Sequence, residues 1–586
     1  MVIALFLISA AALNQARLDD SFVTSELTVS SGETQLPPLR PKSDNTDHDS
    51  VVAARSALLD PLADLRHALE VLQTNWFELW VGAWPTAIDW TSAVINIHLL
   101  ASLSTLSASL NAKGDHAGDE DGANNTRENE LNMYFAQSTA YYFGENAFAI
   151  RNEAYDDMLW VVLGWLQGIN LIRSQSKRQC PSSSPPCQPW HGVQYTAAFA
   201  HRARVFYDIA SRGWDTKLCG GGMTWNPSLE PYKNAITNQL YIAASVGMYL
   251  YFPGDQIDSP FVQQSEGGIV LEPAARHDVK YLRAAIQGYD WLKLSNMTNK
   301  QGLYVDGFHI IGYKFGHNDS LGTRKCDDRN EMVFTYNQGV LLSGLRGLWE
   351  ATGNTSYLDD GHELARNVIT ATGWHLENST VQEDSAWAGL GRNGVLEEYC
   401  DASGYCSQDG QTFKGVFFHH LTLFCQQLPR EPRVPGFTHT DTQVLLLHRH
   451  RCEKYALWVE HNAQAAISTR DEKGRFGGWW GAKSDVKEAV ELPWGAVDYR
   501  NNASNLQGAR EVILQEPSSS SMPGQEPMLV APDVMFRLPN SIPKVKGDHR
   551  SSRGDLNDRG RGRTVETQSG GLAILRALWE FQHMAT

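Results

Sequence analysis

The chain has 586 residues and a formal net charge of −16, from 50 Lys+Arg and 66 Asp+Glu. Phosphate binding needs a basic surface, so this charge argues against a nucleic-acid-binding protein and weakens any case for docking on an anionic membrane. Apolar residues make up 42% of the chain and charged residues 20%, which excludes general disorder and allows a large core.

The N-terminal end has the features of a secreted protein. Residues 1–16, MVIALFLISAAALNQA, form an apolar run of signal-peptide length that is too short to span a bilayer, although no Lys or Arg precedes it. Residues 17–50 are polar and are expected to form a flexible leader. No later segment reaches about 18 uninterrupted apolar residues, so we predict no membrane span. The final segment, LAILRALWEFQHMAT, is interrupted by Arg576 and Glu580 and does not resemble the hydrophobic tail of a GPI anchor.

Cysteines and glycosylation motifs support the same compartment. The chain has eight Cys, and short loops separate Cys180 from Cys187 and Cys400 from Cys406. Each pair could close a disulfide in an oxidising compartment or remain as buried thiols. No Cys/His cluster has zinc spacing, so no metal site is predicted. Six N-x-S/T motifs give weak support for secretion, because such triplets also arise by chance. Their asparagines are Asn124, Asn296, Asn318, Asn354, Asn378 and Asn502.

From residue 51 onward, apolar residues recur at three- and four-residue spacing, which is the pattern of amphipathic helices. We predict an all-α protein in which residues 51–586 form a single (α/α)6 barrel, a toroid of six helical hairpins with a cleft at one end. The alternative is an irregular helical solenoid, which would show a repeat of about 34–47 residues that is not found. The twelve predicted helices cover 51–73, 85–108, 131–149, 153–173, 193–212, 234–252, 277–295, 330–352, 357–372, 414–425, 452–468 and 567–583.

Two stretches do not fit the helical pattern. Residues 426–450 interrupt an otherwise apolar region, and residues 507–564 are rich in Ser, Pro, Arg and Gly. We predict disordered, solvated insertions at both places. Translated intron sequence from a faulty gene model is the alternative, and sequencing the transcript would decide between them. The Arg-Gly tract could contact a polyanion, but a disordered loop is the favoured interpretation.

The strongest local signal is NEAYDDMLWVVLGWLQGIN, residues 152–170, in which Asp156 and Asp157 begin an apolar helix. Acidic residues in a first turn also cap free N–H groups and complement the helix dipole, so the pair alone does not require catalysis. Glycoside hydrolysis, however, uses two carboxyl groups, one ionised and one protonated. Mutual repulsion and desolvation by aromatic neighbours such as Tyr155 and Trp160 would shift the pKa values of such a pair. Side chains about 100° apart on a helix could hold their carboxyl groups at the roughly 5–5.5 Å of a retaining mechanism.

Four further regions carry side chains suited to a sugar. Amides donate and accept hydrogen bonds and suit sugar hydroxyls, and aromatic rings can stack on sugar faces. Helix capping and core packing are the competing roles. Glycines in CGGG, at the start of the first region, allow close backbone approach to a ligand, but the spacing of a phosphate loop is absent. The candidates are Trp225, Asn234 and Asn238, then Tyr336, Asn337 and Gln338, and finally Lys414, Trp479 and Trp480.

The ordered motifs YDDMLWVVLGW, CGGGMTWNP with YKNAITNQL, FTYNQGVLLSGL, FKGVFFHHL and SGGLAILRAL resemble those of glycoside hydrolase family 76, the endo-α-1,6-mannanases, in its fungal branch. The resemblance covers roughly residues 51–425, 452–505 and 567–583. The two poorly patterned insertions have no counterpart in the family, which puts the last helical hairpins in doubt but not the aspartate pair.

The resemblance implies an (α/α)6 barrel, no cofactor, and retaining hydrolysis of α-1,6-linked mannose backbones. It implies that Asp156 is the nucleophile and Asp157 the general acid/base. The cleft residues that it implies are Trp225, Asn234, Asn238, Tyr336, Asn337 and Gln338.

We therefore expect a secreted enzyme, associated with the cell wall or extracellular, that cuts α-1,6-mannan internally. One alternative is a transglycosylase that acts on the mannose core of GPI glycans and attaches wall proteins to glucan. It would share the first chemical step, and the expected lack of a GPI tail favours hydrolysis. A non-catalytic mannan-binding wall protein is the alternative from another class, but such a protein has no use for two crowded carboxylates.

Overall fold

The computed structural model describes residues 60–110, 120–180, 187–256, 273–314, 320–382, 386–430, 441–483, 490–501 and 554–584. All of them belong to one unit, Asp60–Thr586. The predicted signal peptide and leader, residues 1–16 and 17–50, lie outside the described residues, as does most of the predicted insertion at 507–564.

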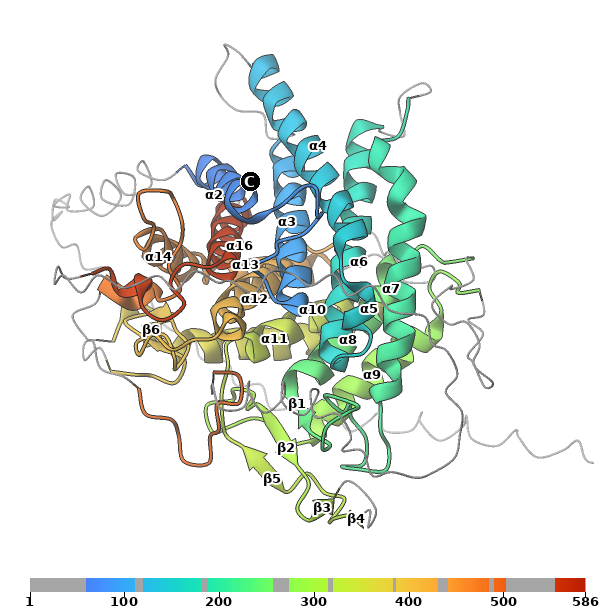
Figure 1. Cartoon of the computed structure of the whole chain (residues 1–586), viewed down its shortest axis with the longest axis vertical. Coiled ribbons are helices and arrows are strands. Elements are labelled where there is room, and N and C mark those ends of the chain that lie inside the picture. The colour runs from blue at the N-terminus through green and yellow to red at the C-terminus, as the bar shows by residue number, and fades with distance from the viewer. Residues whose placement is uncertain are drawn as a thin grey trace, which may run out of the picture. The chain divides into compact units, whose positions relative to one another are not determined.

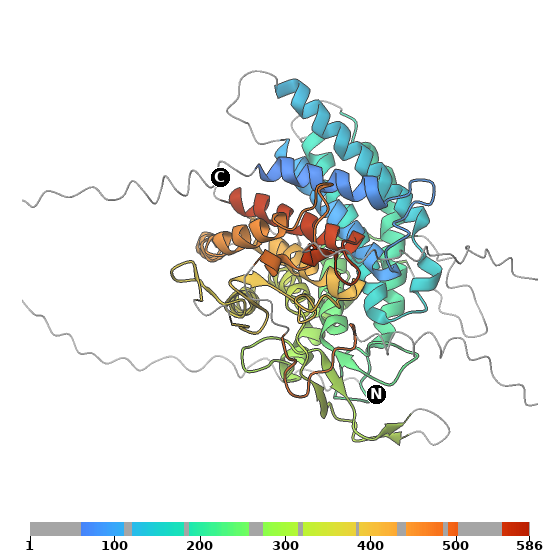
Figure 2. The same ribbon diagram turned by 60° about the vertical axis from the view of Figure 1, so that its left-hand side comes forward.

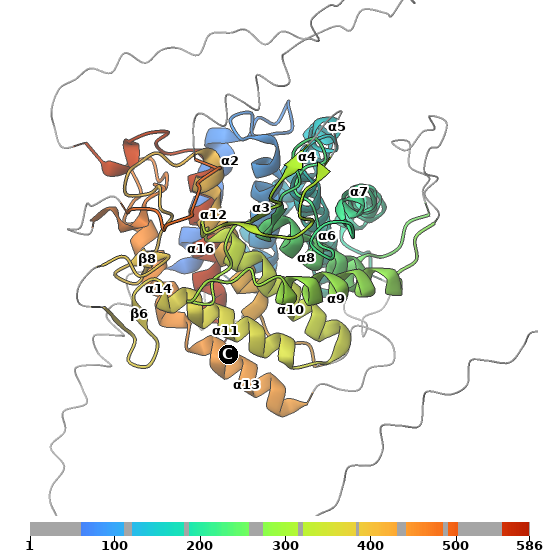
Figure 3. The same cartoon turned by 90° about the horizontal axis from the view of Figure 1, so that it is seen from below.

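Six helices form a closed ring, because each packs against the next and the last returns to the first. The segments that form it are buried on almost every side, as expected for helices that are apolar all round. Figure 3 shows several of them side by side. These inner helices are α3 (Asp89–Ser109), α6 (Tyr155–Gln179), α8 (Ala235–Tyr251), α10 (Tyr336–Thr352), α12 (Gln408–Cys425) and α16 (Val565–Gln582).

Six further helices cover the ring from outside, each packed on at least one inner helix; α14 and α16, for example, lie side by side in Figure 2. Outer and inner helices alternate along the chain, which is the arrangement of an (α/α)6 barrel. The predicted fold class is therefore confirmed, and each of the twelve predicted helices corresponds to one of these. The outer helices are α2 (Pro61–Trp76), α4 (Glu120–Gly144), α7 (Thr196–Ala210), α9 (Val279–Leu294), α11 (Ser356–Thr370) and α14 (Ala456–Ile467).

Local sequence explains where several helices begin and end. Asn234 caps α8 by accepting a hydrogen bond from the backbone N–H of Thr237, and Thr564 caps α16 in the same way. Gly353, with φ of 74°, ends α10 in the left-handed conformation that glycine adopts readily. Among the described helices, α3 is long and apolar enough to cross a membrane, but 83% of its apolar window is buried in the barrel, which identifies it as a core helix.

The remaining elements are short. The strands β1 (Lys233–Asn234), β2 (Gly307–His309) and β5 (Asp328–Asn330) form an antiparallel sheet in the order β1-β2-β5, at the lower edge of Figure 1. Three two-stranded hairpins are β3 (Tyr313–Lys314) with β4 (Ser320–Leu321), β6 (Trp374–His375) with β7 (Thr380–Val381), and β8 (Gly391–Arg392) with β9 (Val395–Leu396). The short helices are α5 (Ala147–Ile150), α13 (Thr442–Glu453), η1 (His191–Tyr195), η2 (Ser211–Gly213), η4 (Trp480–Lys483) and η5 (Leu556–Asp558).

The prediction of a disordered insertion at 426–450 is wrong for its last residues, because α13 begins at Thr442. This helix lies outside α11 (Figure 3), and the Cys425–Cys452 disulfide joins it to the end of α12. Its buried His448 adds a hydrogen bond to α11. The helix was missed because its charged, histidine-rich sequence has no clear apolar face; tertiary contacts hold it in place.

Residues 554–564 likewise differ from the predicted insertion at 507–564. Asn557 is buried, its Oδ1 accepts a hydrogen bond from the backbone N–H of Trp479 at 2.8 Å, and its Nδ2 donates to the carbonyl of the same residue at 3.2 Å. The end of that segment is therefore part of the barrel.

All eight cysteines form disulfides. The predicted pairs Cys180–Cys187 and Cys400–Cys406 are confirmed, so the alternative of buried thiols is excluded for both. Two long-range bonds add to them, Cys219–Cys326 and Cys425–Cys452.

Candidate active site

The first turns of the inner helices meet at one end of the barrel. The indole N–H of Trp90 in α3 donates to Asp409 in α12 at 2.8 Å. The hydroxyl of Thr91 in α3 donates to Glu566 in α16 at 2.9 Å. Asp156 and its neighbour occupy the equivalent first turn of α6. Because helix dipoles place partial positive charge at N-terminal ends, this end of the ring favours carboxylates.

Asp156 is almost fully buried, with 4% of its surface exposed. Its Oδ2 lies 3.7 Å from Nη2 of Arg500, and its Oδ1 has no hydrogen-bond partner among the described residues. Burial raises the pKa of Asp156 to about 6, while the Arg500 cation opposes part of that rise. Above that pH, Asp156 is mostly ionised, and its Oδ1 stays free of hydrogen bonds from the described part of the chain.

Asp157 differs from its neighbour in charge state. Its Oδ2 accepts a hydrogen bond from the backbone N–H of Ala154 at 3.1 Å. The side chain is partly exposed but closely surrounded. Burial is the largest cause that raises the pKa of Asp157 well above its usual range, and repulsion from Asp156 and Glu153 adds to it. Burial also raises the pKa of Glu153 to about 7. Asp157 therefore keeps its proton under conditions in which Asp156 has lost its own, which is the division that acid-assisted nucleophilic displacement needs.

Arg500 comes from a segment far along the chain, residues 490–501, that crosses this end of the barrel. The amide of Asn330 in β5 exchanges two hydrogen bonds with the backbone of Val497, at 3.0 and 2.8 Å. The side chain of Asn501 accepts a hydrogen bond from the backbone N–H of Ser407, just before α12, at 2.7 Å. The segment is therefore fixed at both sides of Arg500.

The guanidinium of Arg500 is the central cation of the site. It lies over the ring of Trp225, 5.0 Å from the ring centroid. Burial opposes its charge, but surrounding acidic groups outweigh burial and raise the pKa of Arg500, so it stays charged. These groups are Tyr336, Asp156, Asp306 and Asp409.

Aromatic rings line the buried side of the site. Tyr336 stacks on Phe413 with centroids 3.8 Å apart, and Trp90 stacks on Trp160 at 6.1 Å. The Tyr336 hydroxyl is buried and has no hydrogen-bond partner among the described residues. The stacked rings form a largely apolar wall, and the Tyr336 hydroxyl on it is available to a ligand.

Three of the six predicted binding residues lie in this site. Trp225 lies beside Asp156 and lowers its pKa, and its indole Nε1 has no other hydrogen-bond partner among the described residues. Tyr336 lies beside Arg500, as described above. Asn337 is buried and its Nδ2 donates to Asp306 at 3.4 Å, while its Oδ1 has no partner among the described residues.

The other three predicted binding residues hold the backbone. Asn234 caps α8 through its Oδ1. Asn238 accepts from the backbone N–H of Met223 at 2.7 Å and donates to the carbonyl of the same residue at 3.2 Å. Gln338 makes the same pair of bonds with Tyr304, at 2.8 Å each. The amides of Asn238 and Gln338 are thus committed at both ends, and we do not propose these two residues as sugar contacts. Nδ2 of Asn234 has no hydrogen-bond partner among the described residues, so its proposed role as a sugar contact stays open to test.

The remaining sequence candidates are core residues. Lys414 forms a buried ion pair with Asp401 at 2.6 Å. Trp479 is 4% exposed and donates to Glu397 at 3.1 Å, and Trp480 is 3% exposed. Core packing, one of the two roles considered for the tryptophans, is the one they have.

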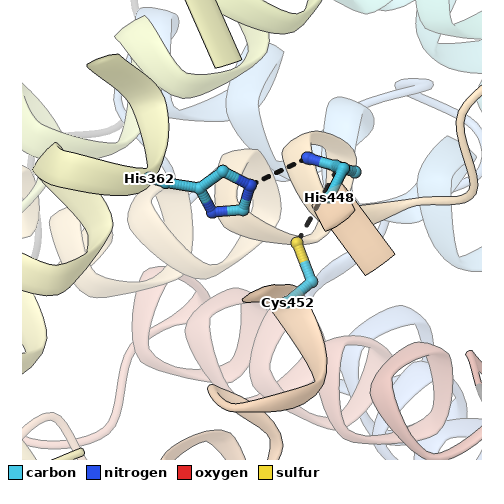
Figure 4. A group of neighbouring side chains, drawn as sticks. All are labelled: His362, His448 and Cys452. Atoms are coloured by element: carbon cyan, nitrogen blue, oxygen red, sulfur yellow. Dashed lines mark hydrogen bonds between the residues drawn. The ribbon is translucent and has the colours of Figure 1, made fainter. Parts of the chain in front are cut away.

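Figure 4 shows the cluster that comes nearest to a metal site among the described residues: His362, His448 and Cys452. Nε2 of His362 lies 2.9 Å from Nδ1 of His448, so the two rings share a hydrogen bond. The sulfur of Cys452 is bonded to Cys425 and cannot act as a thiolate. The second such cluster in the described part of the chain also contains disulfide sulfurs. Both clusters are structural.

Sequence reasoning missed Arg500, Glu153, Asp306 and Asp409 as parts of the site. The segment around Arg500 is irregular and shows no periodicity or motif, so nothing local singled it out. Glu153 lies inside the NEAYDD motif, and its spacing from Asp157 was the one available signal.

Residues 273–484 match glycosyl hydrolase family 76. Mannan endo-1,6-alpha-mannosidase DFG5 of Saccharomyces cerevisiae is 24% identical over 309 residues, 49% of this chain and 55% of that protein. Mannan endo-1,6-alpha-mannosidase DCW1 of Candida glabrata is 27% identical over 249 residues, 41% and 43% of the two chains. The chain thus spans about half the length of the curated relatives it matches.

Solved structures also resemble this one. Dfg5 from Chaetomium thermophilum in complex with glucosamine is 15% identical, with a TM-score of 0.45 over 92% of this chain and 91% of that chain. An inactive variant of the α-1,6-mannanase GH76A of Salegentibacter sp. HEL1_6, in complex with α-1,6-mannotetrose, is 16% identical, with a TM-score of 0.47 over 89% and 100%.

The matched residues 273–484 run from just before α9 to η4 and do not include the aspartate pair. The motifs that carry the resemblance extend to both sides of that span. The match of residues 273–484 to glycosyl hydrolase family 76 and the similarity to the fungal relatives confirm the resemblance found in the sequence.

Proposed function

We propose that this protein is a glycoside hydrolase that cuts α-1,6-mannosidic bonds inside mannan with retention of configuration. The observation that carries the proposal is the pair of adjacent carboxyl groups in the first turn of α6, at the end of the barrel. Their surroundings raise the pKa of Asp157 well above its usual range and that of Asp156 to about 6. The printed names of the fungal relatives support mannan as the substrate class.

In the first step, Oδ1 of Asp156 attacks the anomeric carbon of a mannose residue. The bond from that carbon to the glycosidic oxygen breaks as Asp157 gives its proton to the oxygen, and a glycosyl-enzyme ester forms. In the second step, Asp157 takes a proton from a water molecule whose oxygen attacks the same carbon and releases Asp156. Two displacements on opposite faces give net retention.

The surrounding residues assist each step. Arg500 lowers the pKa of Asp156 and so favours the ionised nucleophile. The negative charges of Asp156 and Glu153 favour the protonated form of Asp157. Trp225 and Tyr336 supply an aromatic surface and a buried hydroxyl that suit the ring face and a hydroxyl group of the sugar.

Action outside the cell is part of the proposal. Four disulfides form in this chain, and disulfides persist in oxidising compartments such as the cell exterior. Secretion followed by action on cell-wall or extracellular mannan accords with these disulfides. Fractionation of the culture into medium, wall and cell extract tests where the protein is found.

The test of the catalytic proposal is digestion of unbranched α-1,6-mannan, with the anomeric configuration of fresh product followed by proton NMR. We expect α-product first, and β-product first would exclude the retaining mechanism. Asp156→Asn and Asp157→Asn should each abolish mannan cleavage, and full activity in either variant would contradict the assignment. Asp359→Asn, an exposed carboxylate on α11, is the matched control.

Substrates with different leaving groups separate the two roles. An aryl α-mannoside with an acidic phenol leaves without protonation, so Asp157→Asn should still release phenol in a burst, whereas Asp156→Asn should not. The same reactions run with an added mannoside acceptor measure transfer against hydrolysis. Tight binding of α-1,6-mannan without turnover of any substrate would instead indicate a binding protein.

A further inference from the structure

A buried cation without a nearby anion lies inside the ring of helices, away from the proposed catalytic residues. Arg576 of α16 is 1% exposed. Its Nη1 approaches Nδ1 of His419 in α12 at 3.4 Å. Its Nε and Nη2 have no hydrogen-bond partner among the described residues. No carboxylate of a described residue lies within ion-pair distance of the Arg576 guanidinium.

The groups around Arg576 do not balance its charge. His98, His419 and His420 are fully buried, and burial lowers the pKa of each far enough to keep all three neutral. Glu580, one helical turn further along α16, accepts a hydrogen bond from Thr105 at 2.6 Å instead. It interacts with Arg576 only at longer range.

Two of the three histidines are held in place by serines. Nδ1 of His98 lies 2.8 Å from the hydroxyl of Ser569, and Nδ1 of His420 lies 2.8 Å from that of Ser343. Nε2 of His420 is buried without a partner among the described residues. Since His419 accepts from the guanidinium through Nδ1, its proton is on Nε2.

An uncompensated charge in such surroundings is costly. Removing one ion from water costs several kcal/mol even after relaxation of the protein, and an arginine side chain does not lose its proton in proteins. The side of the guanidinium that carries Nε and Nη2 is the one that carboxylates and other anions bind with two parallel hydrogen bonds. An anion at that side would supply both the missing charge and the missing acceptor.

We propose that Arg576 binds a small monovalent anion of the chloride class through Nε and Nη2 inside the barrel. A single buried guanidinium beside three neutral imidazoles balances one negative charge, so a divalent anion would reverse the imbalance. Full burial of the surrounding residues favours a monatomic ion.

The site lies beneath the wall of the active site. The ring of His420 is 6.2 Å from that of Trp160, which is on α6 about one turn after Asp156. The anion therefore stabilises the helices that carry the catalytic residues, and it lies outside the sugar-binding surface.

Thermal unfolding of the full chain in chloride and in gluconate, at constant ionic strength, tests the proposal. We expect the Tm of the wild type to rise by about 2–5 °C as chloride replaces gluconate. Arg576→Met should remove that dependence, while Arg449→Met, an exposed arginine of α13, should keep it.

A second measurement covers the case in which Arg576→Met does not fold. Crystals of the wild type grown with bromide should show an anomalous peak beside Nε and Nη2 of Arg576. A chloride-independent Tm together with the absence of that peak would overturn the proposal. A Tm that depends on chloride equally in the wild type and Arg576→Met would also overturn it.

Discussion

Replacing Arg500 by methionine removes the central cation of the proposed active site and keeps much of the side-chain volume. The guanidinium lies 3.7 Å from Asp156 Oδ2, and Coulomb's law gives about 4 kcal/mol for that separation at an effective dielectric constant of about 20. An interaction of that energy would correspond to a change of about 3 units in the pKa of Asp156. Opposite charges at such distances usually lower a carboxyl pKa by about 1–3 units, so we take about 2 units as the expected effect.

The sign of the change follows from the proposed role of each carboxyl group. Asp156 must be ionised to attack, so activity is lost as pH falls through its pKa, which is about 6 in the wild type. Without Arg500 that pKa rises to about 8, and near pH 6 the ionised fraction falls from about one half to about 1%. Because Arg500 also lowers the pKa of Asp157, both limbs of the bell-shaped profile should move to higher pH.

The assay is kcat/KM on α-1,6-linked mannan oligosaccharides across the pH range. At about pH 6 we expect a loss of about 50-fold that shrinks as pH rises. Arg500→Lys keeps the charge and should keep most of the profile. Arg559→Met is the matched control, because Arg559 also lies over a tryptophan, Trp479, at 5.4 Å but does not contact the aspartates. A loss in Arg500→Met of the same factor at every pH would refute the electrostatic role.

Three further predictions concern stability and modification. Burial raises the pKa of Glu398 to about 8, so the protonated Glu398 stabilises the fold at low pH and this effect is lost as pH rises through that value. Glu398→Gln should therefore raise Tm more at pH above about 8 than at about pH 5. A change in Tm that does not depend on pH would contradict the prediction. Replacing Cys425 and Cys452 by serine opens a loop with a sequence separation of 27 and should lower the free energy of unfolding by about 3–4 kcal/mol. Denaturant titration measures this loss, and an unchanged unfolding midpoint would contradict the prediction. Three N-x-S/T asparagines are exposed among those whose surroundings the structure describes, and they should carry glycans in a glycosylating host. Enzymatic deglycosylation should then lower the mass of the protein, and the corresponding Asn→Gln variants should lack that loss. They are Asn296, Asn354 and Asn378.

The fold could be predicted because helix periodicity is a local property of the sequence. Twelve apolar patterns of the correct length, with few strand signals, allow few arrangements other than paired helices around a ring. Helix α13 was not predicted, because it has charged and histidine residues in place of an apolar face. Its position depends on the Cys425–Cys452 bond and on the contact between His448 and His362, which join segments distant in sequence.

The candidate site could be predicted only in part. Asp156 and Asp157 were singled out because they are adjacent and begin a helix, and the family resemblance supplied their predicted roles. Asn238 and Gln338 looked equally suited to a sugar, since an amide in a sequence carries no sign of its partner; their bonds to Met223 and Tyr304 became known only from the structure.

The sequence by itself determined the helices, the aspartate pair and the family resemblance. The tertiary structure alone decided how the pair divides its protons, because a pKa depends on charges and burial within a few ångströms. The two groups that influence the pair most directly show the difference. Glu153 is a neighbour in sequence, whereas Arg500 reaches Asp156 only because the 490–501 segment is anchored across the end of the barrel.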